Sequence, residues 1–169
     1  MTESPDIPWA RSDDSHGMPP KLSGILSPAT GFFLEFLSSR GVRGGTILMV
    51  GCKDGSDAAH LAHAGFVVHA MDVSSASFKH LARYGVHTHG ASPTEFWLFD
   101  NQSFDFVIDT CCFSKEPDSS KREFYVGELR RVLRPGGHYV LSGASTEDGF
   151  NGFDVVAQDK EKTKIMKKI

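Results

Sequence analysis

The sequence predicts an α/β fold: a doubly wound, mostly parallel sheet with helices on both faces and a shortened C-terminal hairpin. Three observations support this fold class. Short apolar runs alternate with segments of helical periodicity along most of the chain, as in buried parallel strands joined by crossover helices. A glycine-containing turn directly follows the first apolar run, which is typical of nucleotide-type βαβ units. A second turn, Pro135-Gly136-Gly137, leads from a long helical segment into another apolar run.

Two regions differ from the rest of the chain in composition. Residues 1–20 carry prolines and charges with little apolar periodicity, so we expect a flexible N-terminal arm before a single domain at residues 21–169. Trp9 is the largest side chain of this arm. It either folds over a ligand as a lid or pins the arm to the domain. The basic segment 160–168 also contains Glu161 and is expected to form a solvated edge.

Charge and cysteine usage argue against several classes of protein. The net charge of -3 disfavours a nucleic-acid-binding surface, which needs a basic field. No stretch approaches the roughly 18 apolar residues of a membrane helix, and the polar N-terminus does not resemble a signal peptide. Cys52, Cys111 and Cys112 form no disulfide framework and suit a reducing cytoplasm. The adjacent pair is expected to pack rather than to carry redox chemistry.

The first predicted elements surround the glycine-containing turn. A helix is expected at residues 28–40, because Ser27 suits the N-cap and Pro28 suits the first helical position. Ile47–Val50 is an apolar, partly β-branched run between glycines, as in a buried strand. A helix is expected at 57–64, where a glycine follows its last residue.

The alternation of strands and helices continues to the C-terminus. A strand at 66–71 ends on Asp72, and a strand at 104–108 is followed by Asp109. The other expected elements are a helix at about 75–84, a strand at 86–89, a helix at 120–133, a strand at 138–142 and a hairpin of 153–157 with 163–166. A hairpin, or a strand followed by a frayed terminus, is expected because residues 144–152 are too few for a crossover helix. Its free edge suits a second copy or a partner protein.

Histidine pairs raise the possibility of a metal site. His87 and His89 share one face of a predicted strand, and His60 and His63 lie three apart on a predicted helix. Neither pair has a carboxylate or cysteine partner at ligand spacing. We therefore expect no metal site.

Four blocks of sequence, in this order, resemble the class I S-adenosylmethionine-dependent methyltransferases. They are Ile47–Gly55, the acid Asp72 after the second strand, Asn101–Asp109, and Leu129–Leu141 with its Arg-Pro-Gly-Gly turn. The resemblance covers about residues 32–142. It implies a seven-stranded sheet with one antiparallel strand and S-adenosylmethionine across the carboxyl ends of strands one, two and four.

The resemblance also implies roles for particular residues. Asp72 is expected to bind the ribose hydroxyls, Val73 to pack on adenine, and Asp109 to face the methionine end and the methyl acceptor. The implied cofactor-binding residues are Gly51, Cys52, Gly55, Asp72, Val73, Ser92 and Asp109. Asp109 is also the catalytic candidate, because an acceptor thiol or amine has to lose its proton. The alternative for Asp109 is a strand-end residue that accepts backbone hydrogen bonds.

The chain departs from the family pattern at three positions. Met49 stands where the family has an acid for the methionine amino group, and Lys53 stands where a glycine is usual. Ala91 occupies the region after strand three where an acid often meets adenine. Asp54 is a partial replacement for the missing acid at position 49.

Three functions follow from these observations. The first is methyl transfer from S-adenosylmethionine to a small-molecule or protein acceptor in the cytoplasm. The second, favoured by Met49 and Lys53, is a non-catalytic methyltransferase-like domain that binds a partner protein. The third, dinucleotide binding, is weak, since Asp54 and Asp57 beside the glycine turn would repel a pyrophosphate.

Overall fold

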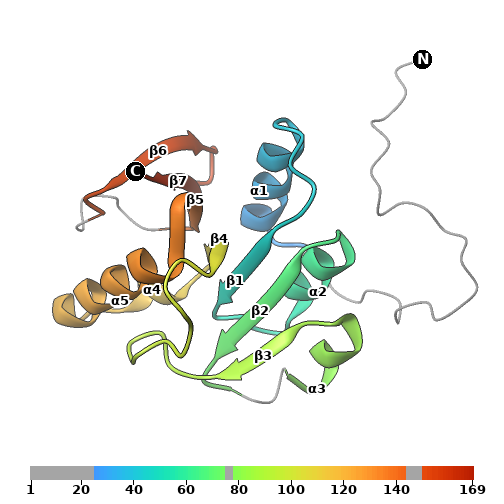
Figure 1. Cartoon of the computed structure of the whole chain (residues 1–169), viewed down its shortest axis with the longest axis horizontal. Coiled ribbons are helices and arrows are strands. Elements are labelled where there is room, and N and C mark those ends of the chain that lie inside the picture. The colour runs from blue at the N-terminus through green and yellow to red at the C-terminus, as the bar shows by residue number, and fades with distance from the viewer. Residues whose placement is uncertain (1–24, 75–77, 144–149) are drawn as a thin grey trace, which may run out of the picture.

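The computed structural model describes residues 25–74, 78–143 and 150–169. A seven-stranded sheet in the order β3-β2-β1-β4-β5-β7-β6 forms the centre of this part of the chain (Figure 1). In chain order the strands are β1 (Thr46–Val50), β2 (Val67–Asp72), β3 (His87–Gly90), β4 (Phe104–Asp109), β5 (Leu133–Leu141), β6 (Phe153–Gln158) and β7 (Lys164–Lys168). The predicted arm at residues 1–20, with Trp9, lies outside the described residues.

The strand pairing confirms the predicted fold class. β1 pairs in parallel with β2 on one side and β4 on the other, while β3 and β5 extend the sheet in parallel. β7 runs antiparallel to both β5 and β6, so the chain closes on the predicted hairpin. Because β1 lies between β2 and β4, the carboxyl ends of these three strands meet at one rim, where α/β sheets bind ligands.

Helices cover both faces of the sheet. On one face lie α1 (Pro28–Ser38), α2 (Ser56–His63) and α3 (Phe78–Leu81); on the other lie α4 (Cys112–Lys115) and α5 (Ser119–Val132). Successive residues of β1 point to opposite faces. Ile47 therefore joins the α1–α2 core and Leu48 joins the α5 core, each with no exposed surface. Within the described ranges, no helix has the length and apolar character needed to cross a bilayer.

Most element boundaries lie within two residues of the prediction, and three elements differ from it in kind or by more than that. The helix expected at 75–84 is α3 followed by a 3-10 turn at Ala82–Tyr84, with residues 75–77 outside the described part. The four-residue helix α4 is too short to give a periodic signal in the sequence. β5 starts at Leu133, where a helix end and turn were expected. Its pairing with β4 shifts register between Leu133 and His138, which accommodates the Pro-Gly-Gly turn inside the strand.

Candidate functional site

The loop after β1 forms the floor of the candidate site. Gly51 and Gly55 have φ angles of 73° and 81°, and the backbone N–H of Gly51 donates to the carbonyl of Met71 in β2 at 2.8 Å. Lys53 adopts a φ of 50°, a region that costs a residue with a β-carbon about 1–2 kcal/mol. The loop therefore has the tight turn predicted from its glycines, and Lys53 introduces strain into it.

Neighbouring side chains press against both glycines. A β-carbon at Gly51 would collide with Sγ of Cys112, and one at Gly55 would lie 2.5 Å from Cδ2 of Leu81. The two positions require glycine for space as well as for backbone conformation. The loop is thus packed between α4 and α3.

Asp72 ends β2 at the rim, and each of its two carboxylate oxygens accepts a hydrogen bond from a different loop. Its Oδ2 accepts a hydrogen bond from the backbone N–H of Cys52 at 3.1 Å, and its Oδ1 accepts one from Ser74 at 2.9 Å. The Sγ of Cys52 lies 3.8 Å from the same Oδ2. Burial, and then the charge of Asp72, raise the pKa of the Cys52 thiol to about 11. Cys52 is therefore a neutral thiol at neutral pH.

Two cavities at this rim share Gly51 in their walls. We call the first, of about 350 Å³, the α1-side cavity; its lining includes Ser27, Met49, Cys52, Lys53, Asp57 and Thr110. We call the second, of about 280 Å³, the Asp72-side cavity; its lining includes Asp72, Val73, Pro93, Cys111 and Cys112. Val73 is 72% exposed, so an apolar side chain is available to a ligand here. A ligand that reached from one cavity to the other would pass over Gly51.

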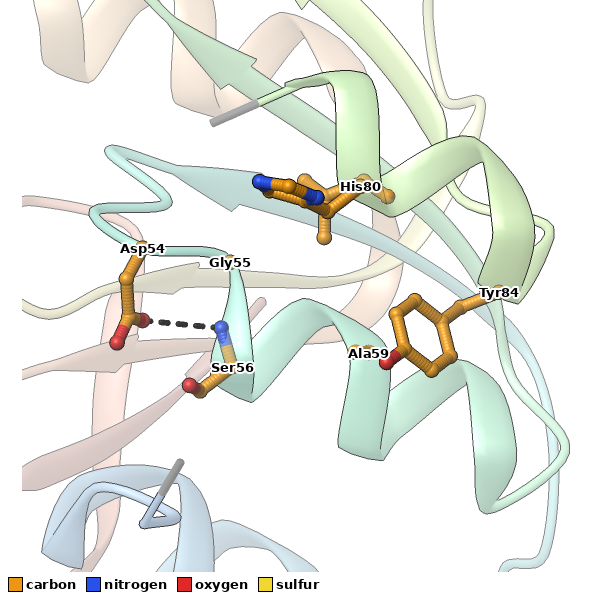
Figure 2. A pocket seen from close by; sticks show the side chains of 7 residues that line it. Asp54, Gly55, Ser56, Ala59, His80 and Tyr84 are labelled. Atoms are coloured by element: carbon orange, nitrogen blue, oxygen red, sulfur yellow. Dashed lines mark hydrogen bonds between the residues drawn. The ribbon is translucent and has the colours of Figure 1, made fainter. Parts of the chain in front are cut away.

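A third, smaller cavity of about 170 Å³ lies between α2 and α3 (Figure 2). Gly55, His80 and Tyr84 line it, together with Asp54. Oδ1 of Asp54 accepts the backbone N–H of Ser56 at 3.0 Å, drawn as the dashed line in Figure 2. Gly55 therefore faces this space rather than the two cavities that share Gly51.

Asp109 ends β4 and is completely buried. Its Oδ1 accepts the backbone N–H groups of Cys111 (2.9 Å) and Cys112 (2.6 Å), and its Oδ2 accepts the N–H of Phe113 (2.9 Å) and the hydroxyl of Tyr125 (2.6 Å). Burial raises the pKa of the Asp109 carboxyl above its usual range, although these four donors act to lower it. The side chain fixes the start of α4 from inside the core.

The remaining predicted residue, Ser92, lies after β3 and is engaged locally. Its hydroxyl pairs with that of Thr94 at 2.9 Å and accepts the backbone N–H of Thr94 at 3.2 Å. Its neighbour Pro93 lines the Asp72-side cavity. Gly51, Cys52, Asp72 and Val73 are thus brought together around the two cavities, while Gly55, Ser92 and Asp109 face other surroundings.

Ser27 and Thr110, which were not predicted as site residues, also line the α1-side cavity. Ser27 caps α1, and its backbone and hydroxyl both donate to Asp57 of α2. Thr110 follows Asp109. The N-cap pattern at Ser27 was visible in the sequence, but its pairing with a residue 30 positions away was not.

Three histidines, His69 of β2 and His87 and His89 of β3, lie together on one face of the sheet. Nδ1 of His69 lies 3.0 Å from Nε2 of His89, and the ring of His87 lies 4.7 Å from that of His69. Burial and the neighbouring imidazoles lower the pKa of His69 to about 4. In the described part of the chain, no group of three or more histidine, cysteine, aspartate or glutamate side chains is arranged to hold a metal ion.

A family model described as a methyltransferase domain matches residues 47–137 of this chain, from β1 to the turn within β5. The search of curated proteins found no match to this chain.

Solved structures share the architecture. A candidate sarcosine dimethylglycine methyltransferase from Galdieria sulphuraria is 22% identical with a TM-score of 0.57, over 67% of this chain and 45% of its own. The 1,6-didemethyltoxoflavin-N1-methyltransferase of Burkholderia thailandensis, solved with S-adenosylhomocysteine, is 23% identical with a TM-score of 0.59, over 82% and 59%. The N-methyltransferase NodS of Bradyrhizobium japonicum, also with S-adenosylhomocysteine, is 16% identical with a TM-score of 0.64, over 82% and 83%. At these identities the likeness shows the fold, and this chain spans about half the length of the first two proteins.

Proposed function

Because the chain belongs to the methyltransferase-domain family, we propose that it transfers a methyl group from S-adenosylmethionine to a small-molecule or protein acceptor. The observation that carries the proposal is the position of Asp72. This carboxylate ends β2 on the wall of a cavity whose floor is the glycine loop after β1. Cavities of this size, with an apolar side chain and a polar group at the rim, suit a small molecule.

The residues present fit the nucleoside part of the cofactor. Asp72 keeps lone pairs beyond those bonded to Cys52 and Ser74, so it is able to accept hydrogen bonds from a ribose diol. Val73 offers an exposed apolar surface for adenine. Gly51 lines both this cavity and the α1-side cavity, which would hold the amino-acid end.

Bound S-adenosylmethionine supplies a methyl group on a positively charged sulfur, so the protein mainly has to orient the acceptor in line with it. Asp109 holds the backbone at Cys111, Cys112 and Phe113, and the first two of these border the Asp72-side cavity. Its complete burial favours this positioning role over direct acceptance of the acceptor's proton. Thr110, next to it, lines the other cavity.

The second candidate function is a non-catalytic domain that binds a partner protein. Met49 favours it, because a buried apolar side chain on the wall of the α1-side cavity cannot anchor an ammonium group. The strained backbone of Lys53 favours it as well. In either case the three unpaired cysteines support a reducing, cytoplasmic location.

Calorimetric titration with S-adenosylmethionine and S-adenosylhomocysteine separates the two functions. Binding with a dissociation constant on the order of micromolar would support methyl transfer. Asp72→Ala should abolish or strongly weaken it, whereas Asp154→Ala on the exposed edge strand β6 should not. The absence of heat at millimolar ligand would leave only the partner-binding function. A large gain in affinity from Met49→Asp would show that the native site has decayed.

A further inference from the structure

The α1-side cavity lacks an acid at position 49 but contains others. Met49 is 2% exposed and presents only carbon and sulfur to the cavity. An ammonium group left there without an acceptor would lose its water without compensation. If this cavity holds the amino-acid end of S-adenosylmethionine, as the proposed function requires, another side chain has to take that charge.

Asp57 is held in place on the same wall. Its Oδ1 accepts the backbone N–H of Ser27 at 2.8 Å, and its Oδ2 accepts the hydroxyls of Ser27 at 2.5 Å and Thr30 at 2.9 Å. A carboxylate has about four acceptor positions, so three donors leave room for one more. Because its orientation is already set by α1 and α2, binding a cation would cost little side-chain entropy.

Asp54 is the other acid of this cavity, and its geometry is less suitable. It is exposed, and its Oδ1 is used in a local turn with the N–H of Ser56 (Figure 2). An exposed carboxylate attracts a cation weakly, because water screens it. Lys53 lies on the same wall and brings a positive charge. Lys53 and Asp57 together match the two opposite charges of an amino acid.

We propose that Asp57, held by Ser27 and Thr30, binds the ammonium group of the cofactor's amino-acid end in place of the missing acid at position 49. This inference rests on the proposed function. It also links cofactor binding to the start of α1, since the donors that orient Asp57 are the N-cap residue of that helix and its neighbour Thr30.

The test is a cycle of two ligands and several variants, measured by calorimetry. S-adenosylhomocysteine carries the amino-acid end, and 5′-methylthioadenosine lacks it. Asp57→Asn keeps the shape of the side chain and removes its charge. We expect this variant to weaken the binding of S-adenosylhomocysteine about tenfold, which is the usual effect of losing one hydrogen bond to a charged group. The affinity for 5′-methylthioadenosine should stay unchanged. The matched control Asp154→Asn, on the exposed edge strand β6, should change the affinity for neither ligand more than about twofold.

Two further variants keep the test decisive. Ser27→Ala retains the Asp57 carboxylate and removes one hydroxyl donor that orients it. It should weaken the binding of S-adenosylhomocysteine by about threefold and leave the binding of 5′-methylthioadenosine unchanged. Adding Met49→Asp to Asp57→Asn should restore binding of S-adenosylhomocysteine. Ser27→Ala answers the question even if Asp57→Asn does not fold.

The outcomes separate this inference from the proposed function. If the wild type binds both ligands and Asp57→Asn has no effect, or weakens both equally, the ammonium role of Asp57 is overturned and the proposed function stands. If the wild type binds neither ligand, both are overturned.

Discussion

Asp72 and Asp109 occupy equivalent places in the fold and have opposite surroundings. Each is the last residue of a strand that pairs in parallel with β1, one on either side. Asp72 is half-buried, bonds two loop N–H groups and lines a cavity. Asp109 has no exposed surface and accepts four hydrogen bonds from α4 and Tyr125. The same residue type at the same rim is available to a ligand in one case and committed to the fold in the other.

The difference shows that the end of a strand does not by itself define a binding residue. What separates the two is the chain that follows. After β2 the backbone continues past Val73, which is exposed. After β4 it turns at once into α4, and the free N–H groups at the start of that helix take the carboxylate. Substitutions at the two positions should therefore separate stability from binding.

The largest effect is expected at Asp109. Asp109→Ala leaves three backbone N–H groups and the hydroxyl of buried Tyr125 without their acceptor, so we expect a loss of about 3–5 kcal/mol in the free energy of unfolding. Asp109→Asn keeps one carbonyl oxygen and should lose less. Denaturant titration measures both. A loss below about 1 kcal/mol for the alanine variant would contradict the role of Asp109 in holding the start of α4.

The next largest effect is expected at Gly51, in the loop after β1 that donates a hydrogen bond to Asp72. Gly51 and Gly85 share a φ of 73°, but a β-carbon meets Sγ of Cys112 at Gly51 and nothing within 4 Å at Gly85. Gly85→Ala should cost about 1 kcal/mol from backbone conformation alone, and Gly51→Ala about 3 kcal/mol, because overpacking is added. Thermal unfolding measures both. Adding Cys112→Ala should recover part of the loss at Gly51 and none at Gly85.

Asp72 should show the reverse of the pattern at Asp109. Asp72→Ala frees the N–H of exposed Ser74, which water can reach, and the single N–H of buried Cys52, so the loss in unfolding free energy should stay within about 2 kcal/mol. Binding of S-adenosylhomocysteine should weaken about 10- to 100-fold, the size of one or two hydrogen bonds to a charged group. Calorimetry and denaturation on the same variant provide the comparison. A strong loss of stability with binding preserved would invert the assignment of the two aspartates.

The smallest effect is the contribution of partly buried His69 to the pH dependence of stability. His69 lies in β2, the strand that ends in Asp72. Burial first, then His87 and His89, lower its pKa to about 4, while the unfolded chain titrates near 6.5. The unfolded state thus binds more protons between these values, so stability present at pH 7 is lost as the pH falls from 6.5 towards 4. The contribution is about 1 kcal/mol, because solvent screens a partly exposed ring.

Unfolding free energies at pH 7 and pH 5 test this expectation. His69→Gln should reduce the difference between the two, and His63→Gln, on the exposed face of α2, should not. An unchanged difference in the His69 variant would show that the three-histidine cluster does not carry this part of the pH dependence.

Local patterns in the sequence determined the architecture. The apolar run at Ile47–Val50, the glycines around it and the acid at Asp72 are short-range signals, and they correctly predicted strand, turn and rim. Their success has a physical reason. A parallel strand covered on both faces has to be apolar along its whole length, and a turn with positive φ favours glycine.

Only the tertiary structure decided which polar groups face a ligand. Asp57 meets Ser27 and Thr30 across about 30 residues, Cys112 packs on Gly51, and Tyr125 reaches Asp109 from another helix. Burial and hydrogen bonding depend on side chains that the fold brings together from distant parts of the chain, and no local pattern encodes them. The sequence therefore determined that a ligand rim exists, and the packing around it determined which acids remain open to the ligand.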